Sequence, residues 1–137
     1  MSWHDSVLVI DDDPAITGLL IEQLALLGYQ ATSAPDAFQA LIQAEALRPK
    51  LIITDIMMPF WGSGIDVYKR FHEHDVLKQV PLIFITAMDP LSTRKLIPSD
   101  PRVRVVYKPL SIPMLEQAVR DLIGAPSNSP TQAGPPA

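Results

Sequence analysis

Short apolar runs, rich in β-branched residues, end at acidic, hydroxyl or amine side chains along this chain. Runs of this kind are typical of strands that are buried on both faces of a parallel sheet. The residues that follow four of these runs are Asp11-Asp12-Asp13, Asp55, Thr86 and Lys108. Because parallel strands end at the same edge of a sheet, we expect these groups to gather at one edge. Several carboxylates, a hydroxyl and an ammonium group suit a divalent cation and a phosphoryl group.

Strand and helix signals alternate five times, which predicts a doubly wound α/β fold with a five-stranded parallel sheet between two layers of helices. Helical periodicity predicts helices over about 14–27, 35–48, 65–74 and 111–123. Leu19, Phe38 and Tyr68 are among the side chains expected to face the core. A fourth helix, within 91–97, is predicted to be shortened or irregular because prolines flank it on both sides.

The chain is long enough to form one domain with a core of its own. With 137 residues and an apolar fraction of 47%, it is expected to fold over residues 6–123, preceded by a short extension, residues 1–5. From residue 124 the sequence is rich in Pro, Ser and Ala and carries no charge. This composition predicts a disordered tail over residues 124–137.

Composition also limits the compartment and the partners. The absence of cysteine excludes disulfides and thiolate metal sites, and a net charge of −4 argues against nucleic acid as a partner. The apolar runs are too short to span a membrane, and the first residues lack the pattern of a signal peptide. We therefore expect a cytoplasmic protein that binds neither nucleic acid nor a membrane.

One doubly wound strand order, 2-1-3-4-5, has its ligand crevice between the first and third strands. In this order Asp11 and Asp12 would face Asp55. Unit charges about 4 Å apart repel by roughly 4 kcal/mol at an effective dielectric constant of about 20, so these carboxylates need a cation between them. Mg²⁺ is the natural candidate because it prefers oxygen ligands and leaves positions open for phosphate. Asp55 is the best nucleophile, and Lys108 and Thr86 would bind the phosphoryl oxygens.

Taken together, the four motifs resemble those of response-regulator receiver domains. That family has an acidic pair after strand one, Asp-x-x-Met-Pro after strand three, Thr or Ser and then Ala after strand four, and Lys-Pro after strand five. The chain supplies Asp11-Asp12, Asp55-Ile56-Met57-Met58-Pro59, Thr86-Ala87 and Lys108-Pro109 in this order. The resemblance covers about residues 6–123. It implies the flavodoxin-like strand order 2-1-3-4-5 and a role as a phosphorylation-dependent signalling switch.

The resemblance also implies a role for each matching residue. Asp55 would be the phosphoacceptor and a Mg²⁺ ligand. Asp12 would be the main direct Mg²⁺ ligand, with Asp11 acting largely through water, and the carbonyl of Met57 would be a further ligand. Lys108 would pair with the phosphoryl group. The peptide bond between Lys108 and Pro109 would be cis, a form adopted by about 5–6% of X–Pro bonds in folded proteins.

The partners implied by the resemblance are a histidine kinase or histidine phosphotransfer protein as donor and a downstream protein that responds to phosphorylation by contact. No DNA-binding output region is expected within this chain. A domain of this kind catalyses its own phosphorylation and dephosphorylation and is not a turnover enzyme. The added charge of about −1.5 to −2 biases nearby elements between two packings.

Some positions depart from the family pattern or tune it. The family usually has Tyr or Phe three residues before the lysine, where this chain has Val105, and Tyr107 is expected on the other face of the strand. In the family, this aromatic ring rotates inward when the Thr hydroxyl moves toward the phosphoryl group. The departure concerns this coupled movement and not phosphorylation itself. Met57 and Met88 follow Asp55 and Thr86 by two positions and bind water poorly, so we expect a long-lived acyl phosphate. Trp61 is expected close enough to the metal to report binding by fluorescence.

Two other functions remain open at this point. Asp11-x-Asp13, followed by Thr86 and Lys108, resembles the first three motifs of phosphatases of the haloacid dehalogenase group. Two features argue against such a phosphatase: the residue two positions after Asp13 is Ala15, and no acidic pair follows Lys108. A phosphate-independent interaction module would keep the fold without the switch. The complete acidic set argues against this module, whereas Val105 and the interrupted fourth helix leave it open.

Overall fold

A parallel sheet of five strands forms the centre of the structure, a computed structural model that describes residues 6–57 and 64–124. The strands lie in the order β2-β1-β3-β4-β5, which confirms the predicted order. Their bounds are Ser6–Ile10 for β1, Gln30–Ala34 for β2, Leu51–Asp55 for β3, Leu82–Thr86 for β4 and Val103–Tyr107 for β5. Because the chain order reverses between β1 and β3, a crevice is expected at the C-terminal ends of these two strands.

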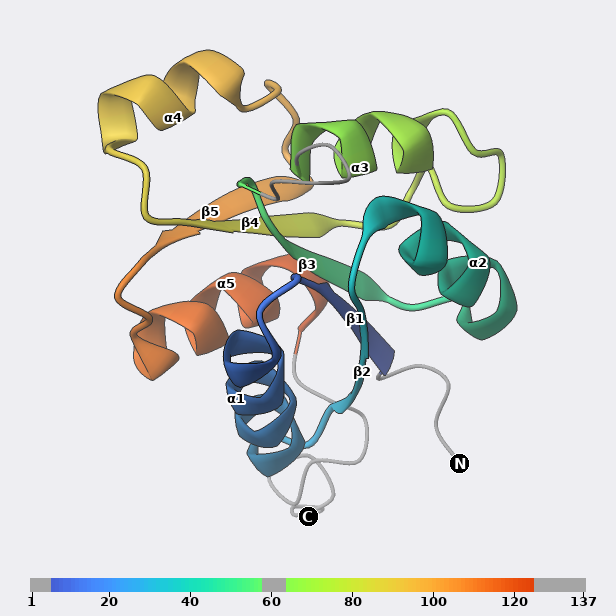
Figure 1. The fold of residues 1–137 in the computed structure, drawn as a ribbon, viewed down its shortest axis with the longest axis horizontal. Coiled ribbons are helices and arrows are strands. Elements are labelled where there is room, and N and C mark those ends of the chain that lie inside the picture. Colours follow the sequence, from blue (N-terminus) through green and yellow to red (C-terminus); the bar gives the residue numbers. More distant parts are fainter. Residues whose placement is uncertain (1–5, 58–63, 125–137) are drawn as a thin grey trace, which may run out of the picture.

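Helices cover both faces of the sheet, with α1 and α5 on one face and α2, α3 and α4 on the other (Figure 1). Their bounds are Pro14–Leu26 for α1, Ala37–Leu47 for α2, Gly64–His72 for α3, Pro90–Leu96 for α4 and Ile112–Ile123 for α5. This arrangement confirms the predicted three-layer α/β sandwich. Within the described ranges, every helix is too short or too polar to cross a membrane.

Each face of the sheet packs against its helices through a separate apolar core. Successive strand residues point to opposite faces, so Leu8 of β1 enters the core under α2 and α3, whereas Val9 enters the core under α1 and α5. β3 and β4 are buried along their whole length. Burial on both faces is the reason that these strands read as continuous apolar runs in the sequence.

Side-chain caps and prolines determine where the helices begin. The Asp13 carboxylate accepts a hydrogen bond from Ala15 N–H at 2.9 Å, and Pro14 occupies the first turn of α1. The same capping role at α2, α4 and α5 falls to Asp36, Asp89 and Ser111. Beyond α1, Gly28 has a φ of 100°, a left-handed conformation that glycine adopts without strain. The predicted starts of the first and last helices are confirmed.

Some apolar side chains lie further out than the sequence predicts. Phe38 is 67% exposed and Leu19 is 40% exposed, so the prediction that they face the core is wrong, and Tyr68 is only partly buried. The buried residues of α2 are Ala37, Ala40 and Ala44. These small side chains form the face that packs on the sheet, and the close packing of a protein interior leaves little room for a phenyl ring there.

The fourth helix is short and weakly buried. It contains seven residues, and Thr93 is the one residue of this helix that is buried. Leu91, in its first turn, is 71% exposed. The prediction of a shortened fourth helix is confirmed, and the helix lacks the apolar stripe that normally fixes a helix on a sheet.

Candidate functional site

The C-terminal ends of β1, β3, β4 and β5 lie along one edge of the sheet. The predicted site residues at these ends are Asp11, Asp55, Thr86 and Lys108. Asp11 follows β1 and Asp55 is the last residue of the neighbouring strand β3. Both are buried, with exposed fractions of 7% and 8%, and Thr86 is fully buried. The edge therefore combines two buried carboxylates with a buried hydroxyl and an amine, as the sequence predicts.

Asp55 is held through both of its carboxylate oxygens. Oδ2 accepts a hydrogen bond from Lys108 Nζ at 2.8 Å, and Oδ1 accepts one from Met57 N–H at 2.8 Å. Burial alone would lower the pKa of Lys108, but the hydrogen bond and charge of Asp55, helped by the charge of Asp11, raise the pKa of Lys108 above its usual value. The ammonium group is therefore charged at neutral pH and is in contact with the carboxylate of β3.

The charged form of the other buried carboxylate, Asp11, is disfavoured. Burial has the largest effect and, with the negative charges of Asp55 and Asp12, raises the pKa of Asp11 to about 6. A hydrogen bond of 2.9 Å from Asp13 N–H to Oδ1, and the charge of Lys108, partly oppose this shift. A cation bound at this edge would favour the ionised form of Asp11.

The oxygen donors at this edge are of the type that Mg²⁺ prefers, but they do not form a ready-made cage. Asp11 and Asp55 supply buried carboxylates, whereas Asp12 is exposed. Across residues 6–57 and 64–124, no three His, Asp or Glu side chains are grouped as metal ligands. Mg²⁺ usually keeps several waters and binds through one or two carboxylates, so the donor set fits a partly hydrated ion. The assignment of Asp11, Asp12, Asp55 and Met57 as ligands stays a prediction.

Thr86 links the end of β4 to its surroundings through its side chain and its main chain. Its Oγ accepts a hydrogen bond from Met88 N–H at 3.0 Å, and its carbonyl accepts one from Lys108 N–H at 2.8 Å. A hydroxyl that accepts one hydrogen bond can still donate one. The peptide bond between Lys108 and Pro109 is cis, which confirms that prediction.

Gly64 is a site residue that the sequence analysis missed. Its N–H donates to the carbonyl of Ile56 at 2.9 Å, which brings the start of α3 against the segment that follows Asp55. A Cβ at this position would overlap the Asp55 carbonyl oxygen. A glycine at the start of a helix does not by itself reveal such a close approach, because the approach depends on a contact that only the folded chain makes.

Tyr107 lies on the same face of β5 as Val105. Residues two apart in a strand point the same way, and Val103 and Val105 both pack against the core under α2 and α3. The expectation that Tyr107 points to the other face is therefore wrong. In the pairing of β4 with β5, the Cα partner of Thr86 is Tyr107, so an aromatic residue and the site threonine are neighbours across the two strands.

Other predicted site positions lie at the rim or outside the described residues. Met57 is 61% exposed, whereas Met88 is partly buried against the core under α2 and α3. Met58, Pro59 and Trp61 fall within residues 58–63, outside the described ranges. The expected fluorescence response of Trp61 to the metal therefore stays a prediction.

Comparisons with known proteins point to one family of domains. The family model described as the response regulator receiver domain matches residues 7–120. The transcriptional regulatory protein TrcR of Mycobacterium tuberculosis is 30% identical over 117 residues, which are 85% of this chain and 44% of TrcR. The polar-differentiation response regulator DivK of Brucella anthropi is 27% identical over 119 residues, which are 87% of this chain and 96% of DivK.

Solved structures share the fold. The chemotaxis protein CheY4 of Vibrio cholerae matches with a TM-score of 0.78 and 23% identity, over 85% of this chain and 97% of CheY4. At this level of identity the likeness shows the fold alone. The chain spans less than half of TrcR but nearly all of DivK and CheY4.

Proposed function

Since the chain belongs to the response-regulator receiver family, which acts in two-component phosphorylation signalling, we propose that it accepts a phosphoryl group on Asp55 in a Mg²⁺-dependent reaction. Receiver domains in general interact with histidine kinases and with downstream proteins. For this chain, the proposed donor is a histidine kinase or a histidine phosphotransfer protein. A downstream protein would respond to the phosphorylated state by direct contact.

The observation that carries this proposal is the contact between Asp55 and Lys108. A buried carboxylate at the end of a central strand has an ammonium group 2.8 Å from Oδ2. Phosphoryl transfer depends mainly on positioning and on neutralising charge on the phosphoryl oxygens. An ammonium group in contact with the nucleophile provides both, because it orients the carboxylate before the reaction and can bind a phosphoryl oxygen during it.

The proposed reaction transfers the phosphoryl group from a nitrogen of the donor imidazole to an oxygen of Asp55. The bond from phosphorus to the carboxylate oxygen forms as the bond from phosphorus to nitrogen breaks, and the imidazole takes up a proton as it leaves. Because Lys108 donates to Oδ2 before the reaction, its ammonium group has to turn from the carboxylate to the phosphoryl oxygens. The Met57 N–H bond to Oδ1 keeps the carboxylate oriented meanwhile.

The proposed Mg²⁺ ligands are Asp11, Asp12, Asp55 and the carbonyl of Met57. When bound, Mg²⁺ would supply charge neutralisation at the transferring phosphoryl group. The raised pKa of Asp11 supports a cation at this edge, because a buried carboxylate next to Asp55 is costly without one. Thr86 would donate its hydroxyl hydrogen to a phosphoryl oxygen.

We infer self-catalysed phosphorylation and dephosphorylation, and not turnover of free phosphate esters. In the phosphatase alternative, Asp13 would take part in catalysis. Instead its Oδ1 accepts the hydrogen bond from Ala15 N–H and caps α1, on the exposed side of the edge. A capping role accounts for Asp13 without any catalytic function.

Incubation with acetyl phosphate and Mg²⁺, followed by intact-protein mass spectrometry, tests the proposed function. We expect a gain of one phosphoryl group in the wild type. Asp55→Asn keeps the shape of the side chain but removes the nucleophile, and should remain unlabelled. Chelation of Mg²⁺ should also abolish labelling, and steady release of phosphate from an aryl phosphate ester would favour the phosphatase instead.

A further inference from the structure

The α4 helix buries little apolar surface of its own. Thr93 is the one buried residue of this helix, and the exposed fractions of Leu91 and Leu96 are 71% and 46%. Apolar burial is what normally fixes a helix on a sheet. With so little of it, the hydrogen bonds at either end of the α4 segment have a larger share in placing the helix.

At the end nearer the site, α4 is linked to Thr86 by a short series of hydrogen bonds. The buried Thr93 hydroxyl donates to the carbonyl of Asp89 at 2.8 Å and lies 3.4 Å from the carbonyl of Met88. The N–H of Met88 donates in turn to Thr86 Oγ at 3.0 Å. A displacement of the Thr86 hydroxyl would therefore act on the first turn of α4.

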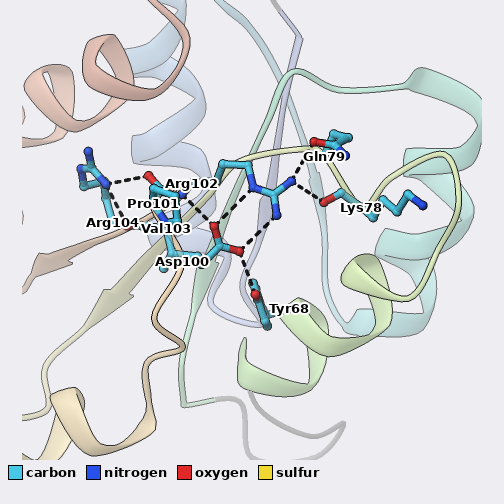
Figure 2. Close-up of polar contacts among 8 residues, drawn as sticks. All are labelled: Tyr68, Lys78, Gln79, Asp100, Pro101, Arg102, Val103 and Arg104. Carbon is cyan, nitrogen blue, oxygen red and sulfur yellow. Dashed lines mark hydrogen bonds and ion pairs between the residues drawn. The ribbon is translucent and has the colours of Figure 1, made fainter.

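At the other end, a polar network joins three segments of the chain (Figure 2). Asp100, which follows α4, accepts hydrogen bonds from the Tyr68 hydroxyl of α3 at 2.8 Å and from Arg102 N–H at 2.9 Å. The guanidinium of Arg102 contacts both oxygens of Asp100 and donates to the Lys78 carbonyl at 2.9 Å and to the Gln79 side chain at 3.0 Å. We call these five residues the Asp100 network.

The Asp100 network has the features of a rigid anchor. The Asp100 side chain is 9% exposed. Burial opposes its charge, but hydrogen bonds from Arg102 and Tyr68 lower the pKa of Asp100 below its usual value, so it is ionised at neutral pH. Hydrogen bonds to an ionised group are stronger than neutral ones. Arg104 adds hydrogen bonds to the carbonyls of Pro101 and Val103, which stiffen the turn into β5.

We propose that the Asp100 network is a fixed pivot for α4, so that a change at Thr86 displaces the first turn of the helix while its far end stays in place. The anchor itself is a property of the unphosphorylated chain. Its part in signalling rests on the proposed function. Tyr68 and Asp100 are thus positioning residues, which hold the far end of α4.

Hydrogen exchange of the unphosphorylated chain tests the pivot directly. Tyr68→Phe removes one hydroxyl and keeps the ring. It should raise exchange at the amides of Thr93, Ile97 and Val103 by on the order of ten-fold, the effect of losing one hydrogen bond to a charged group. Unchanged exchange over residues 89–103, or a uniform rise over the whole chain, would overturn the pivot.

Tyr29→Phe is the matched control. It also removes a hydroxyl with a 2.8 Å hydrogen bond, here to the Gly124 carbonyl on the opposite face of the sheet. Exchange should rise near the end of α5 and stay unchanged over residues 89–103. An equal rise over residues 89–103 in both variants would mean that the effect of Tyr68→Phe is one of general stability, and would contradict the pivot.

A second measurement follows the response to acetyl phosphate and Mg²⁺. Within residues 88–103, phosphorylation of the wild type should alter exchange at residues 88–96 only, whereas in phosphorylated Tyr68→Phe the change should extend to Val103. The same extent in both proteins would contradict the pivot. If the wild type takes up no phosphoryl group, the proposed function fails, and the exchange of the unphosphorylated chain still decides whether the pivot exists.

Discussion

Lys108 Nζ lies 2.8 Å from Asp55 Oδ2, and this ion pair joins the ends of β3 and β5 across the intervening β4. The side chains are 25% and 9% exposed, so water screens the contact less than it screens a surface pair. The same ammonium group that orients the carboxylate is available to a phosphoryl group on it. The ion pair is therefore the structural basis of the proposed phosphorylation of Asp55.

Lys108→Ala should slow labelling of Asp55 by acetyl phosphate. Loss of one positioned donor from a transition state typically costs about 10²–10³-fold in rate. The rate is measured by intact-protein mass spectrometry over time at saturating Mg²⁺. Lys50→Ala, which removes an exposed lysine before β3, is the control and should label at the wild-type rate. An unchanged rate in Lys108→Ala would show that the ammonium group has no part in the transfer.

Asp11→Asn should stabilise the metal-free fold at neutral pH. The folded-state pKa of Asp11, about 6, is raised above the value near 4 of an unfolded chain, so folding disfavours the charged form. Stability from the protonated form is fully present below about pH 4 and is lost as the pH rises through about 6. The variant should therefore gain at most about 3 kcal/mol at pH 7.5 and nothing at pH 4.

Thermal unfolding at these two pH values, with and without Mg²⁺, measures this effect. Added Mg²⁺ should raise the Tm of the wild type more than that of Asp11→Asn, because the cation favours an ionised carboxylate. A Tm difference that is equal at both pH values would contradict the raised pKa of Asp11. An equal response of both proteins to Mg²⁺ would argue against Asp11 as part of the metal site.

Gly64→Ala should destabilise the fold and disturb Asp55. A Cβ at this position overlaps the Asp55 carbonyl oxygen, and backbone atoms cannot move aside as a flexible side chain can. Overpacking of this kind typically costs about 1–3 kcal/mol. The free energy of unfolding in urea and the labelling rate should both fall.

Gly18→Ala is the matched control for this substitution. Gly18 lies within α1, and a Cβ there meets nothing within 4 Å. Alanine is favoured over glycine in a helix by about 0.5–1 kcal/mol, so the free energy of unfolding should rise. If both alanine variants were more stable than the wild type, the close approach at Gly64 would be disproved.

Met57→Asn and Met88→Asn should speed the loss of phosphate from phosphorylated chain. Methionine hydrogen-bonds water poorly, whereas an amide can orient an attacking water. Met57 contacts Asp55 through its N–H, and Met88 contacts Thr86 in the same way, so both side chains start next to the site. The decay of the phosphorylated mass after removal of the donor gives the rate, and unchanged decay in both variants would contradict this hypothesis.

Local and periodic signals account for what could be predicted from the sequence. The ends of β1, β3, β4 and β5 follow apolar runs, and the parallel order then brings Asp11, Asp55 and Lys108 together. Helix starts were predictable because the cap at Asp13 lies within two residues of its partner. The side of β5 on which Tyr107 lies also follows from the sequence, because Val105 and Tyr107 are two residues apart in one strand and so share a face.

Non-local contacts account for what could not be predicted. Phe38 is apolar and stands at helical spacing from other apolar residues, yet alanines occupy the buried face of α2. Whether a phenyl ring or an alanine fits there depends on the distance between the helix and the sheet. The bond from Tyr68 to Asp100 spans 32 positions and leaves no local pattern. The approach of Gly64 to Asp55 likewise depends on two segments that meet only in the folded chain.

Reductive trapping tests the central claim most directly. The chain is labelled with acetyl phosphate and Mg²⁺ and treated with borohydride, which reduces an acyl phosphate of aspartate to homoserine, and peptide mass spectrometry then locates the modified residue. The Asp55 and Lys108 geometry predicts homoserine at position 55 alone, in an amount equal to the phosphate incorporated. Homoserine at position 11, 12 or 13, or its absence from a labelled chain, would contradict the account.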